Sequence, residues 1–464
     1  MGSLFGLLGT IGGGLAAQQA GLTVTGQNVT NVNTPGYVER TAVLETTQDS
    51  TGDGGGVEVK GIDRKFDAFT YANVLTQTGL EGAANARSGA LTSAQAIVAP
   101  TGGGSVGDAM TTFFSALQTM AATPADPSAR AGVLAGAANL AQAFSTTSSG
   151  LSQTRSSLLS QATNEVKTVN TQLAQLATLN GEITTAQGEG DDADDLRDTR
   201  DSLVTSIAGE IGGSVLSDPS GSETMFAAGA PLVTGNQAST ISVSLDSNGA
   251  LTFSASQKGG NGVDITQGVT SGSLGGIREA RDQDVAATSA RLDQLAYDFA
   301  NTVNAIHQTG YGLDGVTGRP LFTPPLSVAG AAGAMSVDSS VAGQPNNVAA
   351  TANAADLPGG NDLVNQLASL SEQPLGSGGT PAQQFGDLAG QLGTATASAT
   401  SEAQMRADTL TQAQNLNSSA SGVSLSEETI NLTRYQQAFE AETNVLQTVS
   451  NMLQNFMTTM NSAG

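Results

Sequence analysis

Apolar side chains recur every seven residues at both ends of the chain, over residues 1–32 and over residues 425–460. This spacing is typical of a helix that packs along a second helix. A strict seven-residue period keeps its apolar line against a partner only when the two helices supercoil. We therefore expect the two ends to be helices that pair with each other. The alternative is that each end packs separately on a globular core.

Each terminal helix presents two lines of predicted contact positions. One line is apolar throughout, whereas the other includes polar residues such as Gln18, Thr25, Glu428 and Glu442. The candidate assembly residues on these lines are Leu4, Leu8, Ile11, Leu15, Leu22, Val29, Val32, Leu425, Leu432, Tyr435, Phe439, Leu446, Val449, Leu453 and Phe456.

The interior of the chain also contains helical patterns. Heptad spacing occurs around residues 151–183, where Asn180 takes an otherwise apolar position, and around residues 280–308. Residues 105–146 predict two helices with a break at the Asp-Pro pair of residues 126–127. An aspartate cap followed by proline is typical of the start of a helix.

Residues 205–275 follow a strand pattern. Alternating residues at 241–245 and 251–253 flank an Asp-Ser-Asn-Gly turn, which predicts a β-hairpin. We expect a β-rich domain inserted here between helical segments. Small β elements are expected at 41–67, and residues 310–360, rich in Gly, Pro and Ala, are expected to mix short strands with loops.

These patterns together predict a mixed, mainly α protein. Residues 1–35 with 422–464 would form a terminal α-helical coiled-coil domain, and residues 36–204 with 276–421 a mainly helical middle domain with small β elements. Residues 205–275 would form the inserted β-rich outer domain, to which part of 310–355 could belong. This layout suits a subunit that polymerises through its two ends.

Composition excludes several classes of function. The net charge is 17 − 41 = −24, so binding to nucleic acid or to anionic lipid is disfavoured. The absence of cysteine excludes disulfides, cysteine-ligated zinc and thiol catalysis. No apolar run reaches the roughly 18 residues that a membrane helix needs, and the N-terminus lacks the basic region of a signal peptide. We expect no membrane insertion and, if the chain is exported, a route without signal cleavage.

Few side chains could support catalysis or metal binding. His307 is the only histidine and follows Ile306 at the end of a predicted helix, which favours a capping or packing role. The acidic run from Asp191 to Asp195 could bind calcium. It lacks EF-hand spacing and precedes a helix predicted to begin near Leu196, so we interpret it as a solvated loop and helix cap. We expect no enzyme activity, no cofactor and no metal site.

Several motifs resemble a known family. Residues 27–37 and 56–67 resemble the N-terminal motif shared by the rod, hook and hook-associated proteins of bacterial flagella. The segments that resemble the hook-associated members at the hook–filament junction are 113–130, 195–203, 272–278, 301–322 and 421–438. The motif residues that match are Asn28, Asn31, Asn33, Gly36, Tyr37, Asn304, His307, Gly310, Gln436 and Gln437.

The resemblance implies a structural subunit that is exported through the flagellar type III apparatus with an uncleaved N-terminus. A cytoplasmic export chaperone would hold the C-terminal helix before export. Outside the cell, identical subunits would form a helical ring between the hook protein and hook-associated protein 3. The alternatives are that the chain is itself a hook protein or hook-associated protein 3, or that it is an axial scaffold with a hydrolytic insert at 205–275.

Overall fold

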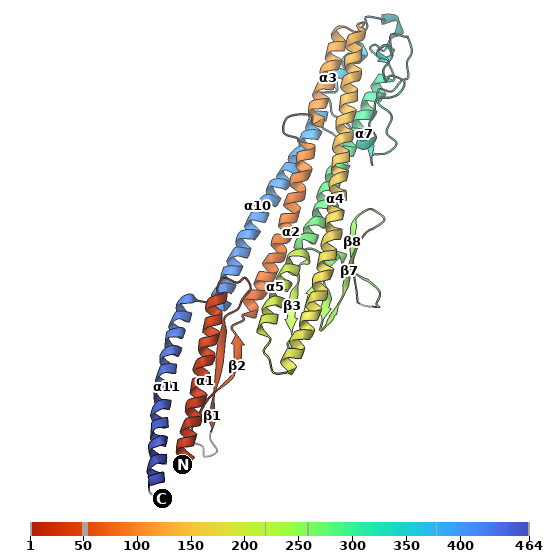
Figure 1. The fold of residues 1–464 in the computed structure, drawn as a ribbon. Coiled ribbons are helices and arrows are strands. Elements are labelled where there is room, and N and C mark those ends of the chain that lie inside the picture. Colours follow the sequence, from red (N-terminus) through yellow and green to blue (C-terminus); the bar gives the residue numbers. More distant parts are fainter. Residues whose placement is uncertain (1, 49–53, 219, 258, 377, 463–464) are drawn as a thin grey trace.

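The molecule is a long, narrow stack of helices with both ends of the chain at the same tip (Figure 1). It is a computed structural model that describes residues 2–48, 54–218, 220–257, 259–376 and 378–462. Long helices dominate, and the strands form three small antiparallel sheets. The predicted fold class, mixed and mainly α, is confirmed.

The longer helices are α1 (Gly2–Asn31), α2 (Ala68–Val98), α3 (Val106–Ala122), α4 (Pro127–Gly188), α5 (Asp194–Ile211), α7 (Ala286–His307), α10 (Pro381–Ser421) and α11 (Leu425–Ser462). The shorter ones are α6 (Gly272–Glu279), α8 (Ala331–Ala334) and α9 (Asp362–Ser369), and a π-helical turn at Ala280–Val285 joins α6 to α7. No helix in the described part of the chain has an apolar stretch long enough to cross a bilayer.

The strands are β1 (Arg40–Gln48) and β2 (Gly54–Arg64) in the first sheet, β3 (Ser214–Ser217), β4 (Glu223–Ala227), β5 (Ala230–Thr234) and β6 (Gln237–Ala238) in the second, and β7 (Thr240–Leu245), β8 (Leu251–Ser256) and β9 (Val263–Asp264) in the third. The β1–β2 hairpin confirms the small β elements predicted at 41–67. The predicted hairpin of 241–253 is also confirmed, since β7 pairs with β8 in antiparallel register.

Helices near the N-terminus pair with helices near the C-terminus in nested order. α1 lies along α11, α2 along α10, and α3 against α9, so segments far apart in the chain are neighbours in space (Figure 1). The α1–α11 pair forms the tip that carries both termini, with the β1–β2 hairpin against α1. The predicted pairing of the two chain ends is therefore confirmed.

Helix α4 runs most of the length of the body. The predicted break before it is confirmed, because α3 ends at Ala122 and the Asp126 side chain accepts a hydrogen bond from the Ser128 amide at the start of α4. The helix then continues for 62 residues, or roughly 93 Å at 1.5 Å per residue. The helical patterns before and after residue 150 thus belong to one helix.

Two apolar cores follow each other along α4. The first, the distal core, includes α3, the first half of α4, α7 and the start of α10. Its centre holds Phe113, Phe114, Phe299 and Phe322, whose ring centroids lie 5.6–5.9 Å apart in tilted or edge-to-face arrangements. The second, the central core, includes α2, the second half of α4, α5, α6 and both sheets of the inserted segment.

The inserted segment is narrower than predicted and shares its core with the helices. Residues 205–211 are the end of α5, so the strands occupy 214–264 within the predicted 205–275. Inward-facing strand residues such as Met225 and Phe253 pack in the central core with Leu173 of α4. Because one face of α4 is covered by these sheets, the sheets also stabilise the helical body.

Two asparagines of α4 bind the sheets directly. The Asn180 side chain donates to the carbonyl oxygens of Glu223 and Gly235, at 2.7 and 2.9 Å, and accepts from the Glu223 amide at 3.2 Å. Asn170 likewise bonds both the amide and the carbonyl of Ile241. The polar residue at an apolar heptad position is explained by this role, since buried strand groups need hydrogen-bond partners.

The prediction of short strands at 310–360 is wrong. The structure describes all of these residues and places in them only two isolated bridges, Tyr311 with Thr351 and Phe322 with Val337, together with helical turns. Side chains of α7 bond this backbone in place of a strand ladder: Asn304 donates to the Phe322 carbonyl and accepts from the amides of Leu321 and Phe322.

Candidate assembly surface at the chain ends

Helices α1 and α11 pack along a seam in which side chains of α11 lie directly against the backbone of α1. The seam residues are Gly14, Gly21 and Asn28 of α1, which face Glu442, Tyr435 and Glu428 of α11 in that order. Both sets are spaced by seven, and the order shows that the helices are antiparallel. A Cβ atom on Gly21 would lie 2.6 Å from the Tyr435 ring, and one on Gly14 would lie 2.6 Å from the Glu442 carboxylate.

The neighbouring glycine serves the opposite side of α1. A Cβ atom on Gly13 would lie 2.5 Å from the carbonyl oxygen of Val57 in β2. Glycine weakens a helix interior by about 1 kcal/mol relative to alanine. At these positions the loss in helix stability is offset, because the missing side chains let α11 and the hairpin pack directly against the backbone of α1.

The predicted assembly residues differ in how deeply they are buried. Ile11 and Val449 are buried in the single copy. Those that are half-buried are Leu8, Leu15, Leu22, Val32, Leu432, Tyr435, Leu446 and Leu453, and those more than a third exposed are Val29, Leu425, Phe439 and Phe456. The side chain of Leu4 lies outside the described residues.

The most buried line of α11 is the mixed one. Its deepest residues are Glu428 and Val449, at 2% and 4% exposed, whereas Leu425 and Phe439 of the wholly apolar line are 50% and 37% exposed. The reason is that Gly14 and Gly21 leave space on α1 for the large polar side chains of Glu442 and Tyr435. The apolar line is therefore only partly covered by α1.

Asn28 joins four segments at one end of the seam. Its side-chain amide donates to Glu428 Oε1 at 2.9 Å and to the Arg40 carbonyl at 2.8 Å. Its oxygen accepts from the Tyr37 hydroxyl at 2.9 Å and from the Arg40 amide at 3.1 Å. All four bonding positions of this 1% exposed amide are thus used. Burial raises the pKa of Glu428, and the Asn28 bond opposes that shift.

The other motif residues near Asn28 shape the turn or lie on the surface. Gly36 has φ of +82°, and a side chain there would meet Ser202 of α5. Asn31 donates to the Gln27 carbonyl within its own helix and accepts from Thr34. The remaining motif residues of the tip, which are exposed, are Asn33, Gln436 and Gln437.

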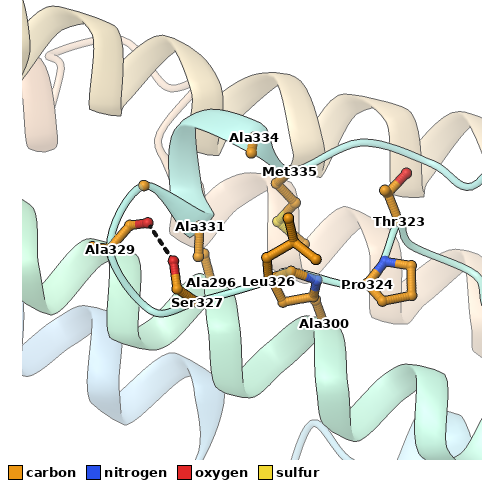
Figure 2. Close-up of a pocket in the computed structure, with 12 residues that line it drawn as sticks. Ala296, Ala300, Thr323, Pro324, Leu326, Ser327, Ala329, Ala331, Ala334 and Met335 are labelled. Atoms are coloured by element: carbon orange, nitrogen blue, oxygen red, sulfur yellow. Dashed lines mark hydrogen bonds between the residues drawn. The ribbon is translucent and has the colours of Figure 1, made fainter.

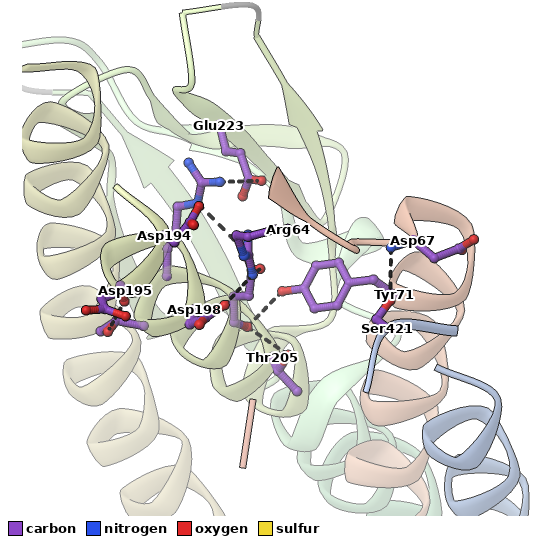
Figure 3. A network of polar contacts seen from close by, with 12 residues as sticks. Arg64, Asp67, Tyr71, Asp194, Asp195, Asp198, Thr205, Glu223 and Ser421 are labelled. Atoms are coloured by element: carbon purple, nitrogen blue, oxygen red, sulfur yellow. Dashed lines mark hydrogen bonds and ion pairs between the residues drawn. The ribbon is translucent and has the colours of Figure 1, made fainter. Parts of the chain in front are cut away.

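The hairpin is held to the body by arginines and by the acidic start of α5 (Figure 3). Arg40 donates to Asp195 at 2.6 Å and to Asp198 at 2.8 Å. Arg64 contacts Asp198 as well and donates to Asp201 at 2.8 Å. Burial raises the pKa of Asp198, while the two guanidinium groups oppose that shift. The acids of α5 therefore act as the docking site of the hairpin.

The interpretation of residues 191–195 as a solvated loop and helix cap is wrong in part. α5 begins at Asp194, and its cap position is Ala193, at φ of +54° and without a side-chain cap bond. Asp194 is 9% exposed and lies 3.9 Å from Arg40, and Asp192 accepts from the Ile62 amide of β2. Among the described residues, no group of three His, Cys, Asp or Glu side chains is placed to hold a metal ion.

The joint between α10 and α11 is bound to the same region. The Ser421 carbonyl accepts from the Glu39 amide at 2.9 Å, and the Ser421 hydroxyl accepts from the Asp67 amide at 3.0 Å (Figure 3). Thr70 donates to Asn417 at 2.9 Å. The joint, the hairpin and α5 thus form one polar cluster between the tip and the body.

The contacts of Arg40, Arg64 and Ser421 are not predicted by any sequence pattern. A signal for the acidic partners was present, because Asp194, Asp195, Asp198 and Asp201 recur at helical spacing. The arginines lie in strands far away in sequence, so their partners could not be identified without the fold.

The motif residues of α7 lie in the distal core, away from the tip. His307 is 1% exposed; its Nδ1 bonds the Arg319 carbonyl at 2.7 Å, and its Nε2 accepts from the Ala349 amide at 3.0 Å. These contacts require the neutral ring, and burial lowers the pKa to about 4. A Cβ on Gly310 would lie 2.5 Å from Leu363. These residues hold the loop after α7 in place.

A separate apolar pocket of about 310 Å³ lies between α7 and α8 (Figure 2). Ala296 and Ala300 form its α7 side, Met335 closes its end, and Leu326 at the rim is fully exposed. Its lining includes no titratable side chain, so it has no groups for acid–base chemistry.

The chain is similar to flagellar proteins over most of its length. The family model described as "Flagellar hook-associated protein FlgK helical domain" matches residues 91–322, half of the chain. The model described as "Flagellar basal body rod FlgEFG protein C-terminal" matches residues 414–460, which include the α10–α11 joint and most of α11.

Individual relatives agree with these matches. Flagellar hook-associated protein 1 of Salmonella typhimurium is 32% identical over 67% of this chain and 58% of its own length. The protein of the same name in Bacillus subtilis is 26% identical over 92% of both chains. The solved structure of the flagellar hook junction protein FlgK from Burkholderia pseudomallei covers 54% of this chain and 46% of its own, with a TM-score of 0.50 and 28% identity.

Replacing Asn28 by alanine should loosen the seam. The change removes the Asn28 hydrogen bonds of Glu428, of the Tyr37 hydroxyl and of the Arg40 backbone, and such buried losses cost about 1–3 kcal/mol. We expect amide exchange in α11 to be faster by roughly 5- to 150-fold. Gln19→Ala, at an exposed position of α1, is the matched control. Equal exchange in the two variants would contradict a linking role for Asn28.

His307 should stay neutral well below its ordinary pKa. A folded-state pKa of about 4, against an ordinary histidine pKa of 6.5, means that this group favours folding above pH 6.5. The contribution, roughly 3 kcal/mol at 1.36 kcal/mol per unit, is lost as the pH falls from 6.5 to 4. Since the chain has one histidine, NMR of labelled imidazole gives one signal. It should not shift between pH 8 and 5.5; a midpoint near 6.5 would refute the buried, neutral assignment.

Proposed function

Because this chain belongs to the FlgK family of flagellar hook-associated proteins, we propose that it is a structural subunit that joins the hook of the bacterial flagellum to the filament. The matched region spans 58% of the length of the Salmonella relative, and the name of the Burkholderia protein describes it as a hook junction protein. The role proposed for this chain is mechanical, as an adaptor ring needed for filament assembly.

The α1–α11 tip is the observation that carries this proposal. α1 has no charged side chain, and every charge of α11 lies between Glu427 and Glu442. Val445, Met452 and Phe456 of α11 are 47–59% exposed in the single copy. Exposed apolar surface on a soluble protein indicates a contact surface. Beyond Glu442 the described part of the tip carries no charged side chain, so identical copies can pack closely there without bringing like charges together.

The proposed partners follow from the family and from this surface. Copies of the chain form a helical ring through their tips, with the hook protein on one side and hook-associated protein 3 on the other. The chain is exported by the flagellar type III apparatus without signal cleavage and functions outside the cell. A cytoplasmic export chaperone covers the C-terminal helix before assembly, because its apolar residues would otherwise be exposed.

The alternatives have less support. The match to a FlgK helical domain over residues 91–322 favours a junction protein over a hook protein or hook-associated protein 3. A hydrolytic insert would need two free carboxylates that face each other. In the inserted segment Glu223 pairs with Arg200, and Asp218, Asp246 and Asp264 each accept from nearby backbone amides.

Deleting the gene should give cells with hooks but no attached filaments, and flagellin should appear in the medium. The reason is that filament subunits would lack the adaptor on which to assemble. Electron microscopy of the cells and immunoblots of the medium measure both effects. Normal attached filaments in the deletion strain would refute the proposed function.

Leu446→Asp in the last helix should block incorporation without unfolding the body. Leu446 is half-buried in one copy, so the carboxylate stays hydrated there. In an assembled ring the same group would lose water, at a cost of several kcal/mol. Binding of the chaperone should weaken as well. We expect complementation of the deletion strain to fail, with circular dichroism unchanged.

Leu446→Met is the matched control, because it keeps the volume and polarity and should cost under about 1.5 kcal/mol. If the aspartate variant restores filaments as well as the methionine variant does, the C-terminal helix is not the polymerisation surface.

A further inference from the structure

We propose that Arg434 of one copy forms an ion pair with Glu440 of the next copy, so that this pair sets the direction in which copies follow one another. The inference rests on the proposed function, since it concerns contacts between copies at the tip. It goes further by identifying the side chains that join them.

Arg434 is a cation that forms no ion pair with any described carboxylate of its own copy. Among the described residues of α1 and α11 it is the only cationic side chain, and no ion pair includes it within the described chain. Its guanidinium group lies 5.1 Å from the centre of the Tyr435 ring. Because Tyr435 is packed against Gly21 in the seam, this contact fixes the direction of the exposed cation.

Glu440 is the acid best placed for the next copy. Glu428 and Glu442 face α1 in the seam, and Glu427 lies one heptad before Arg434, on the same side of the helix. Glu440 is exposed and has no hydrogen-bond or ion-pair partner within the described chain. It is therefore the acid of α11 that is both free and on another face.

Helix geometry places the two charges on opposite flanks. At about 100° per residue, six residues turn the helix by about 240°, so Arg434 and Glu440 point to either side of the line that faces α1. They are separated by roughly 9 Å along the axis. Identical copies that build a ring or a helix must contact each other through two different surfaces. One flank that carries the cation and one that carries the anion meet this requirement.

The two flanks also differ in their other residues. Ala438, Val445 and Met452 follow Arg434 on the first flank, whereas the flank of Glu440 carries Thr433, Gln436, Gln447 and Asn451. In a ring the α11 helices of neighbouring copies run in the same direction, so two like flanks at equal height would bring Arg434 against Arg434, or Glu440 against Glu440. Such contacts are repulsive, so the charges favour the order in which unlike flanks meet.

Charge balance supports the same pairing. α11 carries one arginine and four glutamates, a net charge of 1 − 4 = −3. A ring brings the charged stretches of neighbouring α11 helices together, and without ion pairs these negative stretches would repel one another. Since α1 offers no charged side chain, α11 is the one of the two paired helices of a neighbouring copy that can supply an acid for Arg434.

Charge exchange tests the proposal in a strain that lacks the chromosomal gene. Arg434→Glu and Glu440→Arg should each lower the amount of protein in purified hook–junction particles, because each places like charges together. The double variant R434E/E440R should restore incorporation. Both positions are exposed, so the circular dichroism of each variant should match that of the natural chain. Single variants that incorporate normally, or a double variant that does not recover, would overturn the pair.

Cross-linking gives an independent measurement. The chain has no cysteine, so R434C/E440C introduces two thiols on opposite flanks, and a bifunctional maleimide should link assembled copies into a ladder of multimers. Each single variant should stay monomeric. Dimers from a single variant would show that like flanks meet, and monomers from an assembled double variant would show that the two positions are apart; either overturns the proposal.

These outcomes are distinct from failure of the proposed function. If the natural chain is absent from hook–junction particles, the junction role itself is wrong. If the natural chain is present and the charge variants behave as it does, the junction role stands and the Arg434–Glu440 pair is refuted.

Discussion

Close approach of backbone to side chain in the α1–α11 seam is the constraint on which the tip depends. Gly14 and Gly21 give space to Glu442 and Tyr435, and Gly13 gives space to β2. A helix with so many glycines has low stability by itself. It is held because α11 and the hairpin contact it on two sides. Asn28 then fixes the register, since one polar residue with specific partners disfavours any shifted pairing.

The tip is attached to the body by polar bonds more than by apolar packing. Arg40 and Arg64 bind the acids of α5, and Ser421 accepts from backbone amides on either side of the hairpin. Charge-assisted bonds of this kind are short and directional. These bonds therefore fix the hairpin and the α10–α11 joint in one orientation against α5.

The helical organisation could be predicted from the sequence because apolar period and proline position are local signals. The break before Pro127, the β7–β8 hairpin and the pairing of the chain ends all follow from such signals. The register of the seam could not be predicted, since its deepest line runs through Glu428 and depends on glycines more than 400 residues earlier in the chain. The role of Asp194 and Asp198 depends on arginines in a distant hairpin. The same limit explains why loop 310–360 was predicted to contain strands: side chains of Asn304 and His307 satisfy its backbone in their place.

Pairing from the outside of the sequence inward has a consequence for how the chain matures. Asn28 and Glu428 are 400 residues apart. In the same way, α2 packs on α10, which lies far later in the chain. A chain that emerges from one end first can form α3, α4 and the sheets around residue 230 as soon as these have emerged, but its tip has no partner until the last helix arrives. The tip is therefore complete only after α11 has emerged. In a chain truncated before residue 425, α1 has no α11 to pack against and stays exposed.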